Sequence, residues 1–213
     1  MGKVISGRWG SGRSETSPRS KAREARSATA PPSQLKISLL EIEPEIWRRV
    51  LVPRGVRLDQ LHEIFQVAMG WTNSHLHEFR VGDTRYWEPD PEYDEGDVRE
   101  ERSVRLFEVA PGLNDSFLYE YDFGDSWEHL VVVEKVLTPE ESPADLPVCL
   151  AGARACPPED CGGVPGYEGF LEAIRDPEHE EHQAMLTWVG GKFDPEAFDL
   201  GKVNRKLRRL KRL

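Results

Sequence analysis

The sequence predicts an α+β fold: a single compact domain in which antiparallel β-hairpins pack with several helices. Two patterns favour this class. Several short segments alternate apolar and polar residues, which is typical of strands with one buried face. One longer segment repeats apolar residues at intervals of three and four, which is typical of a helix. With 213 residues, 38% of them hydrophobic, the chain is long enough to bury one sizeable core.

The first half of this domain is expected to hold three strands and one helix. Alternation predicts strands over residues 35–39, 45–52 and 75–82. Residues 57–70 are predicted to form a helix that ends at Gly70, because glycine is a natural C-terminal stop. Its apolar stripe consists of Leu58, Leu61, Ile64, Phe65 and Ala68. Residues 83–101 are rich in acids and are expected to be an exposed loop.

The second half is built around the stretch YDFGDSWEH, residues 121–129. Residues 117–123 and 127–136 alternate strongly, and Gly124 between them suits the tight turn of a β-hairpin. In that turn Asp122 and Asp125 would accept hydrogen bonds from backbone amides. Residues 103–110 are predicted to be a short helix or strand, residues 143–166 to be irregular, and residues 167–176 and 181–190 to be short helices.

The ends of the chain differ in charge from its middle. The formal net charge is −10, yet residues 1–30 and 202–213 hold seven Lys or Arg residues each. Residues 1–33 are rich in Ser, Arg, Gly and Ala, so we predict a disordered basic tail, followed by a domain over residues 34–213 that ends in a basic amphipathic helix. No apolar run reaches the roughly 20 residues of a membrane helix. Three cysteines make no disulfide framework. We therefore expect a cytoplasmic protein without a membrane partner.

Six motifs give the sequence a family resemblance: IWRRVLVP, LDQLHEIFQVAMGW, HLHEF, YDFGDSWEH, CPPEDCGGVPGY and KFDPEAFDL. In order and spacing they resemble the plasmid pRiA4b ORF-3-like family over about residues 34–210. Members are often described as TnpR-type passenger proteins of insertion elements. The resemblance implies a compact α+β domain and a mobile-element setting, but no particular activity. Recombinase chemistry is not expected, because the Tyr-x-Arg-x-Ser start of a serine resolvase is missing from the sequence.

The cysteines form the first candidate site. Cys149, Cys156 and Cys161 lie in the segment predicted to be irregular, and thiolates on such a loop can converge on a tetrahedral zinc ion. His129 is the candidate fourth ligand, because its hairpin strand can bring it near the thiols. The alternative is that the three residues are small buried thiols.

A histidine pair forms the second candidate site. His75 and His77 share one face of the strand predicted over 75–82, and two such imidazoles can chelate one metal ion. The oxygen ligands would come from Asp122, Asp125 or Glu78. The alternative is that the histidines pack beside aromatic residues and bond locally. Glu159 and Asp160, in a separate turn, are candidates for an acid and a base, or for acceptors of backbone amides.

These sites leave two functions open. The first is a binding or adaptor module of a mobile element, with a protein or small ligand on its body and nucleic acid at its basic ends. The cationic face of the C-terminal helix favours it: Arg205, Lys206, Arg208, Arg209, Lys211 and Arg212. That face could instead complement the acidic body. The second function is a metal-dependent, nuclease-like hydrolase that uses His75, His77, Asp122, Asp125 and His129.

Overall fold

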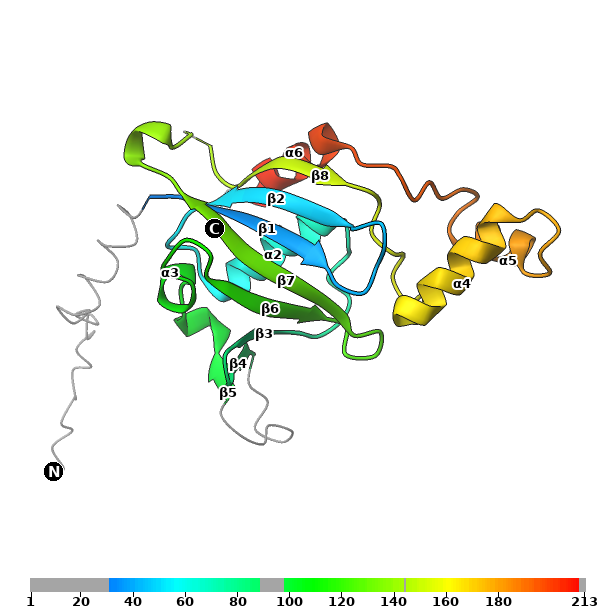
Figure 1. Cartoon of the computed structure of the whole chain (residues 1–213), viewed down its shortest axis with the longest axis horizontal. Coiled ribbons are helices and arrows are strands. Elements are labelled where there is room, and N and C mark those ends of the chain that lie inside the picture. Colours follow the sequence, from blue (N-terminus) through cyan, green and yellow to red (C-terminus); the bar gives the residue numbers. More distant parts are fainter. Residues whose placement is uncertain (1–30, 89–97, 144, 211–213) are drawn as a thin grey trace, which may run out of the picture.

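The computed structural model describes residues 31–88, 98–143 and 145–210 (Figure 1). Most of the predicted tail, residues 1–30, lies outside these ranges, and so do Lys211 and Arg212. The first strand begins at Ser33, the last residue of the predicted tail.

An antiparallel sheet forms the body of the described chain. Its strand order is β5-β4-β3-β6-β7-β1-β2-β8, and every neighbouring pair is antiparallel except β4 and β5. The strands are β1 (Ser33–Leu39), β2 (Trp47–Val52), β3 (His77–Val81), β4 (Thr84–Trp87), β5 (Val98–Glu100), β6 (Ser116–Tyr121), β7 (Trp127–Val136) and β8 (Val148–Ala153). This sheet and its helices confirm the predicted α+β class.

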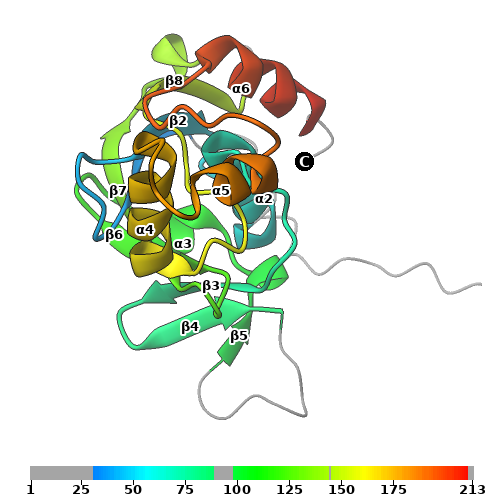
Figure 2. The same ribbon diagram turned by 90° about the vertical axis from the view of Figure 1, so that its right-hand side faces the viewer.

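The helices lie on one side of the sheet and beyond its end (Figures 1 and 2). α2 lies behind the sheet in Figure 1, α6 lies beside β8, and α4 and α5 project together past the strands. The helices are α2 (Leu58–Met69), α3 (Leu106–Val109), α4 (Gly163–Arg175), α5 (His182–Trp188) and α6 (Leu200–Leu207), with short 3-10 turns η1 (Glu101–Ser103), η2 (Pro139–Glu141) and η3 (Arg208–Leu210). None of these helices is long and apolar enough to cross a membrane.

The core lies between α2 and the sheet, as the two periodicities predict. Each residue of the α2 stripe is fully buried, and the helix ends at Gly70 in the left-handed conformation, with φ 113°. The Phe65 ring packs edge-on against Tyr119 of β6, with ring centroids 5.3 Å apart. Phe117, Tyr119 and Tyr121 of β6 point into this core, whereas Phe123 lies in the turn and is 38% exposed.

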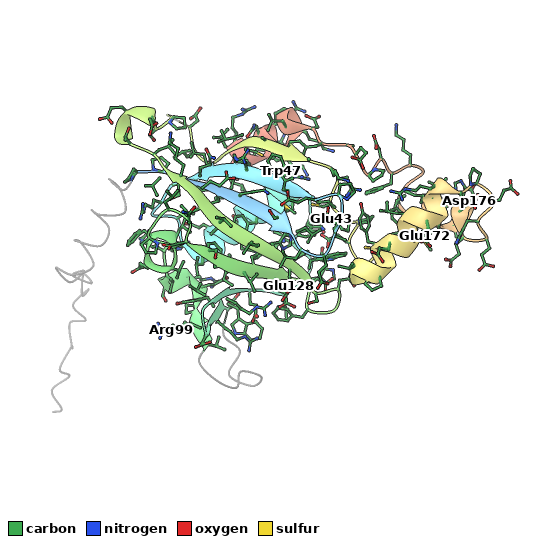
Figure 3. The ribbon with its side chains drawn as sticks, in the orientation of Figure 1. Glu43, Trp47, Arg99, Glu128, Glu172 and Asp176 are labelled. Atoms are coloured by element: carbon green, nitrogen blue, oxygen red, sulfur yellow. The ribbon has the colours of Figure 1, made fainter. Side chains whose placement is uncertain are left out.

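The opposite face of the sheet is polar. Trp47 and Glu128 lie on this face (Figure 3). Arg49 stacks over the Trp47 ring at 5.1 Å and pairs with Glu134, while Arg80 pairs with Glu128. A sheet with one apolar and one polar face explains why the strands alternate so clearly in the sequence.

Two segment predictions were wrong. Residues 143–166 contain β8, which extends the sheet by pairing with β2. Its sequence, VCLAGA, is too rich in small residues to show strand alternation. Asn204 of α6 instead fixes this edge, because its side chain accepts from the amide of Cys149 and donates to the same residue's carbonyl, both at 2.8 Å. Residues 83–101 were predicted to be a loop, yet β4 and β5 lie within them.

Two glycines of α4 provide a matched test of this packing. A Cβ on Gly166 would lie 1.9 Å from the carbonyl oxygen of Cys161, whereas one on Gly169 would meet nothing within 4 Å. We expect Gly166→Ala to destabilise the protein by about 3 kcal/mol, since neighbouring backbone must shift. Gly169→Ala should stabilise it by about 0.5–1 kcal/mol, since glycine is costly inside a helix. Urea unfolding of both variants measures the difference, and equal midpoints would contradict the described contact.

Candidate metal centre

The hairpin turn places the first acidic side chain of the site. β6 and β7 pair as predicted, with Tyr121 opposite Trp127. Asp122 follows β6 in the left-handed conformation, with φ 59°, and its amide donates to the Leu76 carbonyl at 2.8 Å. Its Oδ1 accepts from the amide of Gly124 at 3.0 Å. Only Oδ1 is needed to close the turn, so Oδ2 is left to face another group.

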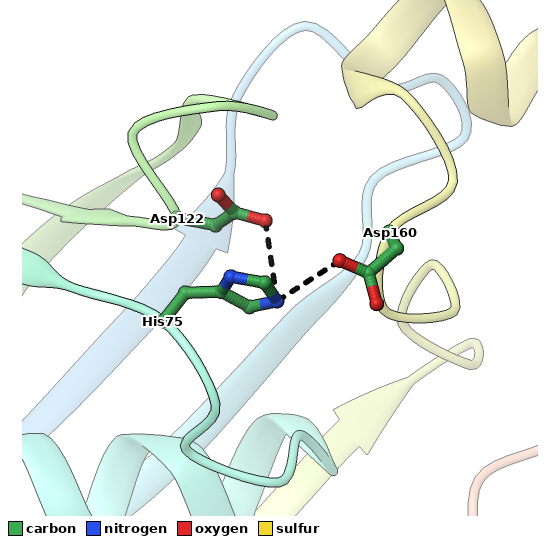
Figure 4. Close-up of side chains that lie close together, drawn as sticks. All are labelled: His75, Asp122 and Asp160. Atoms are coloured by element: carbon green, nitrogen blue, oxygen red, sulfur yellow. Dashed lines mark ion pairs between the residues drawn. The ribbon is translucent and has the colours of Figure 1, made fainter.

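His75 is that group, and it comes from the loop before β3 (Figure 4). Its Nε2 lies 3.6 Å from Asp122 Oδ2, 3.1 Å from Asp160 Oδ1 and 3.8 Å from Glu159 Oε2. The Nε2 atom is buried and forms no hydrogen bond of good geometry with the described residues. The Nε2 atom of His75 therefore faces three carboxylates and forms a hydrogen bond of good geometry with none of them.

The remaining carboxylates come from the loop between β8 and α4. Asp160 also has a left-handed backbone, with φ 59°, and its side chain is 71% exposed. Glu159 is held more firmly: its Oε1 accepts from the Thr72 amide at 2.7 Å, and its Oε2 accepts from the Tyr121 hydroxyl at 3.2 Å. These bonds tie the loop after α2 and the end of β6 to the loop before α4.

The arrangement has the donor set of a divalent cation site. One ligand atom each from His75, Asp122 and Asp160 lie within 4.8 Å of one another, and no other such group of three occurs among the described residues. An imidazole nitrogen with carboxylate oxygens suits zinc, manganese or iron. Because Asp160 is exposed, water or a substrate can reach the same position.

The carboxylates create a negative field that acts on neighbouring groups. Burial, together with Glu159, raises the pKa of Tyr121 to about 12. Burial also raises the pKa of Cys161 to about 12, with a further contribution from Asp125. The Cys161 thiol therefore stays protonated at neutral pH, which makes it a poor metal ligand and a poor nucleophile.

The structure does not bring the predicted zinc ligands together. No three of Cys149, Cys156, Cys161 and His129 belong to a described group with metal-ligand spacing. Cys149 is buried in β8 and Cys156 lies 3.8 Å from Nη2 of Arg48. Burial raises the pKa of Cys149, and it raises the pKa of Cys156 to about 11. The geometry agrees with the alternative of separate, partly or fully buried thiols.

His129 lies in the core of the sheet. Its Nδ1 donates to the Tyr119 carbonyl at 3.0 Å, which leaves Nε2 unprotonated, buried and without a partner in the described structure. The ring packs edge-on against Trp71, with centroids 5.1 Å apart. Burial lowers the pKa of His129 to about 4, so the ring is neutral at physiological pH.

His77 points to a different partner from His75. Its Nε2 lies 2.9 Å from Glu101, and its ring stacks on His62 at 3.4 Å. His62 bonds the Tyr119 hydroxyl and the Asn73 side chain, and burial with the neighbouring His77 lowers its pKa to about 3. β3 begins at His77, so the two predicted metal ligands do not share a strand face.

The cationic residues of the C-terminal segment are at the surface. Leu207 packs into the core, while the four described residues of the predicted nucleic-acid face are exposed: Arg205, Lys206, Arg208 and Arg209. Arg205 lies 3.9 Å from Asp199, the N-cap of its own helix.

Fold and site together define an α+β protein with a candidate cation site formed by three loops at one end of its sheet. The family model named plasmid pRiA4b ORF-3-like protein matches residues 32–202, so the chain belongs to that family. It is 42% identical to the uncharacterized protein y4hQ of Sinorhizobium fredii (strain NBRC 101917 / NGR234), over 81% of this chain and 88% of that protein. It also resembles the crystal structure of a protein of unknown function, MM3350 from Methanosarcina mazei Go1. That match has a TM-score of 0.73 and 39% identity, and covers 81% of this chain and 96% of the other.

The buried histidines predict how stability depends on pH. His129 and His62 have folded-state pKa values of about 4 and about 3, against about 6.5 for an unfolded histidine. Their contribution is complete above pH about 6.5 and is lost as the pH falls toward the folded values, by up to about 1.4 kcal/mol per pH unit for each ring. Urea unfolding between pH 7 and pH 5 should show this loss. His129→Phe should reduce the slope by about one proton, and an unchanged slope would contradict the burial of a neutral ring.

Proposed function

We propose that this protein is a metal-dependent hydrolase with a centre formed by His75, Asp122 and Asp160. The convergence of their ligand atoms within 4.8 Å is the observation that supports it most. Glu159 adds a third carboxylate at 3.8 Å from His75 Nε2. A cation at this position would offset the repulsion among the acids and would satisfy the unbonded imidazole nitrogen.

The residues would divide the chemistry as follows. A bound divalent ion lowers the pKa of a coordinated water and polarises an oxygen of the substrate. His75, Asp122 and Asp160 would hold the ion while leaving coordination positions open. Glu159 is placed to accept a proton from the water, since Thr72 and Tyr121 fix its carboxylate beside the centre. This assignment keeps His75 and Asp122 of the expected His/Asp cluster and adds Glu159 and Asp160.

A second role is favoured by a different observation. The exposed cations of α6 and η3 form a surface that can contact phosphate groups, in a protein whose formal net charge is −10. We propose that this surface binds nucleic acid, as expected of a binding or adaptor module. The hydrolase and this surface can serve one nuclease-like function or act separately.

Metal titration tests the centre directly. Protein cleared of metal with EDTA should bind one Mn²⁺ ion in a calorimetric titration. Asp160→Asn should weaken binding by at least about tenfold, the loss that even second-shell partners of a metal can cause. Asp83→Asn, a change of an exposed acid in the β3–β4 turn, is the matched control and should bind as wild type. No difference between the two variants would remove the proposed centre.

Two further variants separate the candidate sites and activities. Cys149→Ser should leave metal binding unchanged, whereas His75→Ala should abolish it; the reverse pattern would favour a thiol site. Metal-dependent cleavage of bis-p-nitrophenyl phosphate, lost in His75→Ala, would support the hydrolase. Metal binding without cleavage of any phosphate ester would contradict the hydrolase and favour the binding module.

Charge removal tests the cationic surface. Arg208→Gln combined with Arg209→Gln keeps the buried Leu207 and removes two exposed charges. If both contact duplex DNA, the slope of log affinity against log salt should become shallower by about 1.8. Lys135→Gln with Arg102→Gln removes two exposed cations elsewhere and is the control. An equal effect of both double variants would indicate net charge rather than a defined surface.

A further inference from the structure

A groove of about 730 Å³ opens beside the candidate metal centre. Its volume falls in the range of small-molecule sites. The end of α2, α5, α6 and the segment around Glu159 line it, and Figure 2 shows the three helices on one side of the molecule. The residues that matter here are Trp71, Trp188, Phe193, Phe198, Lys202 and Lys206. We refer to this feature as the aromatic–lysine groove.

Trp188 gives the groove an exposed aromatic surface. The Trp188 side chain is 47% exposed, although burial of a large aromatic ring is favourable. Its ring packs edge-on against Phe170, with centroids 5.7 Å apart, and Phe170 also contacts Phe193 at 5.2 Å. One side of the indole is thus supported from within while the rest stays open. A supported, half-exposed indole is suited to stack on a planar ring.

The groove also holds more cations than acids, because Arg48, Lys202 and Lys206 line it together with Glu159 and Asp199. Lys202 and Lys206 are one turn apart on α6, both exposed, and no described carboxylate lies within 4.0 Å of either amine. Arg48 lines the same groove, is 2% exposed and likewise has no described carboxylate within 4.0 Å. Its guanidinium donates instead to the carbonyls of Trp47, Ala68, Ala153 and Arg154. The Cys156 thiol and the Phe198 ring also contact this guanidinium, so its neighbours are neutral and its positive charge favours an anion nearby.

We propose that the aromatic–lysine groove binds single-stranded nucleic acid, with a base on Trp188 and phosphates at Lys202 and Lys206. This inference rests on the proposed function, because it names the substrate of the same centre. Glu159 lines the groove and also faces His75, so a strand in the groove runs up to the candidate metal ion. Single strands fit better than a duplex, because the base faces needed for stacking are covered in a duplex.

The test measures binding of a fluorescein-labelled eight-nucleotide oligothymidine to the full chain by anisotropy, in EDTA. Trp188→Ala should weaken binding about thirtyfold, the middle of the range for loss of one base stack. Lys202→Gln with Lys206→Gln should make the salt slope shallower by about 1.4, the value for two contacts to a single strand. Phe123→Ala, another exposed aromatic, and Lys135→Gln are the matched controls and should leave both quantities unchanged.

The outcomes separate this inference from the proposed function. An unchanged affinity in Trp188→Ala, or an equal loss of affinity for an eight-base-pair duplex in that variant, would overturn the groove. Equal affinity for thymidine monophosphate would contradict the proposal that the groove binds a nucleic-acid strand rather than a single nucleotide. Because EDTA is present, loss of the metal centre cannot imitate any of these results. Metal-dependent cleavage of bis-p-nitrophenyl phosphate together with failed oligothymidine binding would overturn the groove alone.

Discussion

The Asp122 carboxylate connects the fold to the candidate site. One oxygen closes the hairpin turn through the Gly124 amide, and the other faces His75 at 3.6 Å. The residue is only 7% exposed and has a left-handed backbone, a conformation that aspartate accepts better than most residues. A turn that needed both oxygens would leave none for a cation. The two oxygens of Asp122 therefore have separate roles: Oδ1 stabilises the hairpin turn, and Oδ2 faces the candidate metal centre.

The same hairpin turn also contacts the segment that leads into α4. The Gly162 amide donates to Asp125 Oδ2 at 3.1 Å, and Gly163 approaches the Asp125 carbonyl so closely that a Cβ would lie 2.7 Å from it. These contacts fix the start of α4, and with it the short segment that holds Glu159 and Asp160. Movement of the turn would therefore move the acids as well as His75. This coupling makes the position of the hairpin the main constraint on the site.

Local patterns predicted most of the elements but only parts of the site. Alternation and the three-four repeat depend on which face of a segment is buried, so they revealed the hairpin and the α2 helix directly. The sequence also grouped His75 with Asp122, but it singled out Glu159 and Asp160 separately, as an acid and a base. Their convergence depends on how the loop after β8 packs on the hairpin, a contact between residues about 40 positions apart that no local pattern encodes. β8 itself was missed because its small residues show no alternation, and its partners β2 and Asn204 lie far away in the sequence.

The surroundings of the histidines could likewise be predicted only in part from local sequence patterns. His129 alternates with apolar residues of β7, so its burial follows from the strand pattern, but its distance from the thiols did not. His62 of α2 is only 4% exposed, because Tyr119 and Asn73 satisfy both ring nitrogens. A polar residue can be buried when its partners come from other elements. Such partners are visible only in three dimensions.

Glu159 lies between the acidic candidate metal centre and the aromatic–lysine groove. On one side it stands with His75, Asp122 and Asp160, where acids outnumber cationic groups and favour a metal ion. On the other it lines a groove in which Lys202 and Lys206 favour phosphate. A phosphodiester needs both: cations to bind its charge and a metal-bound water to attack it. The overall charge of −10 therefore does not oppose an anionic substrate, because Arg48, Lys202 and Lys206 outnumber Glu159 and Asp199 along the groove.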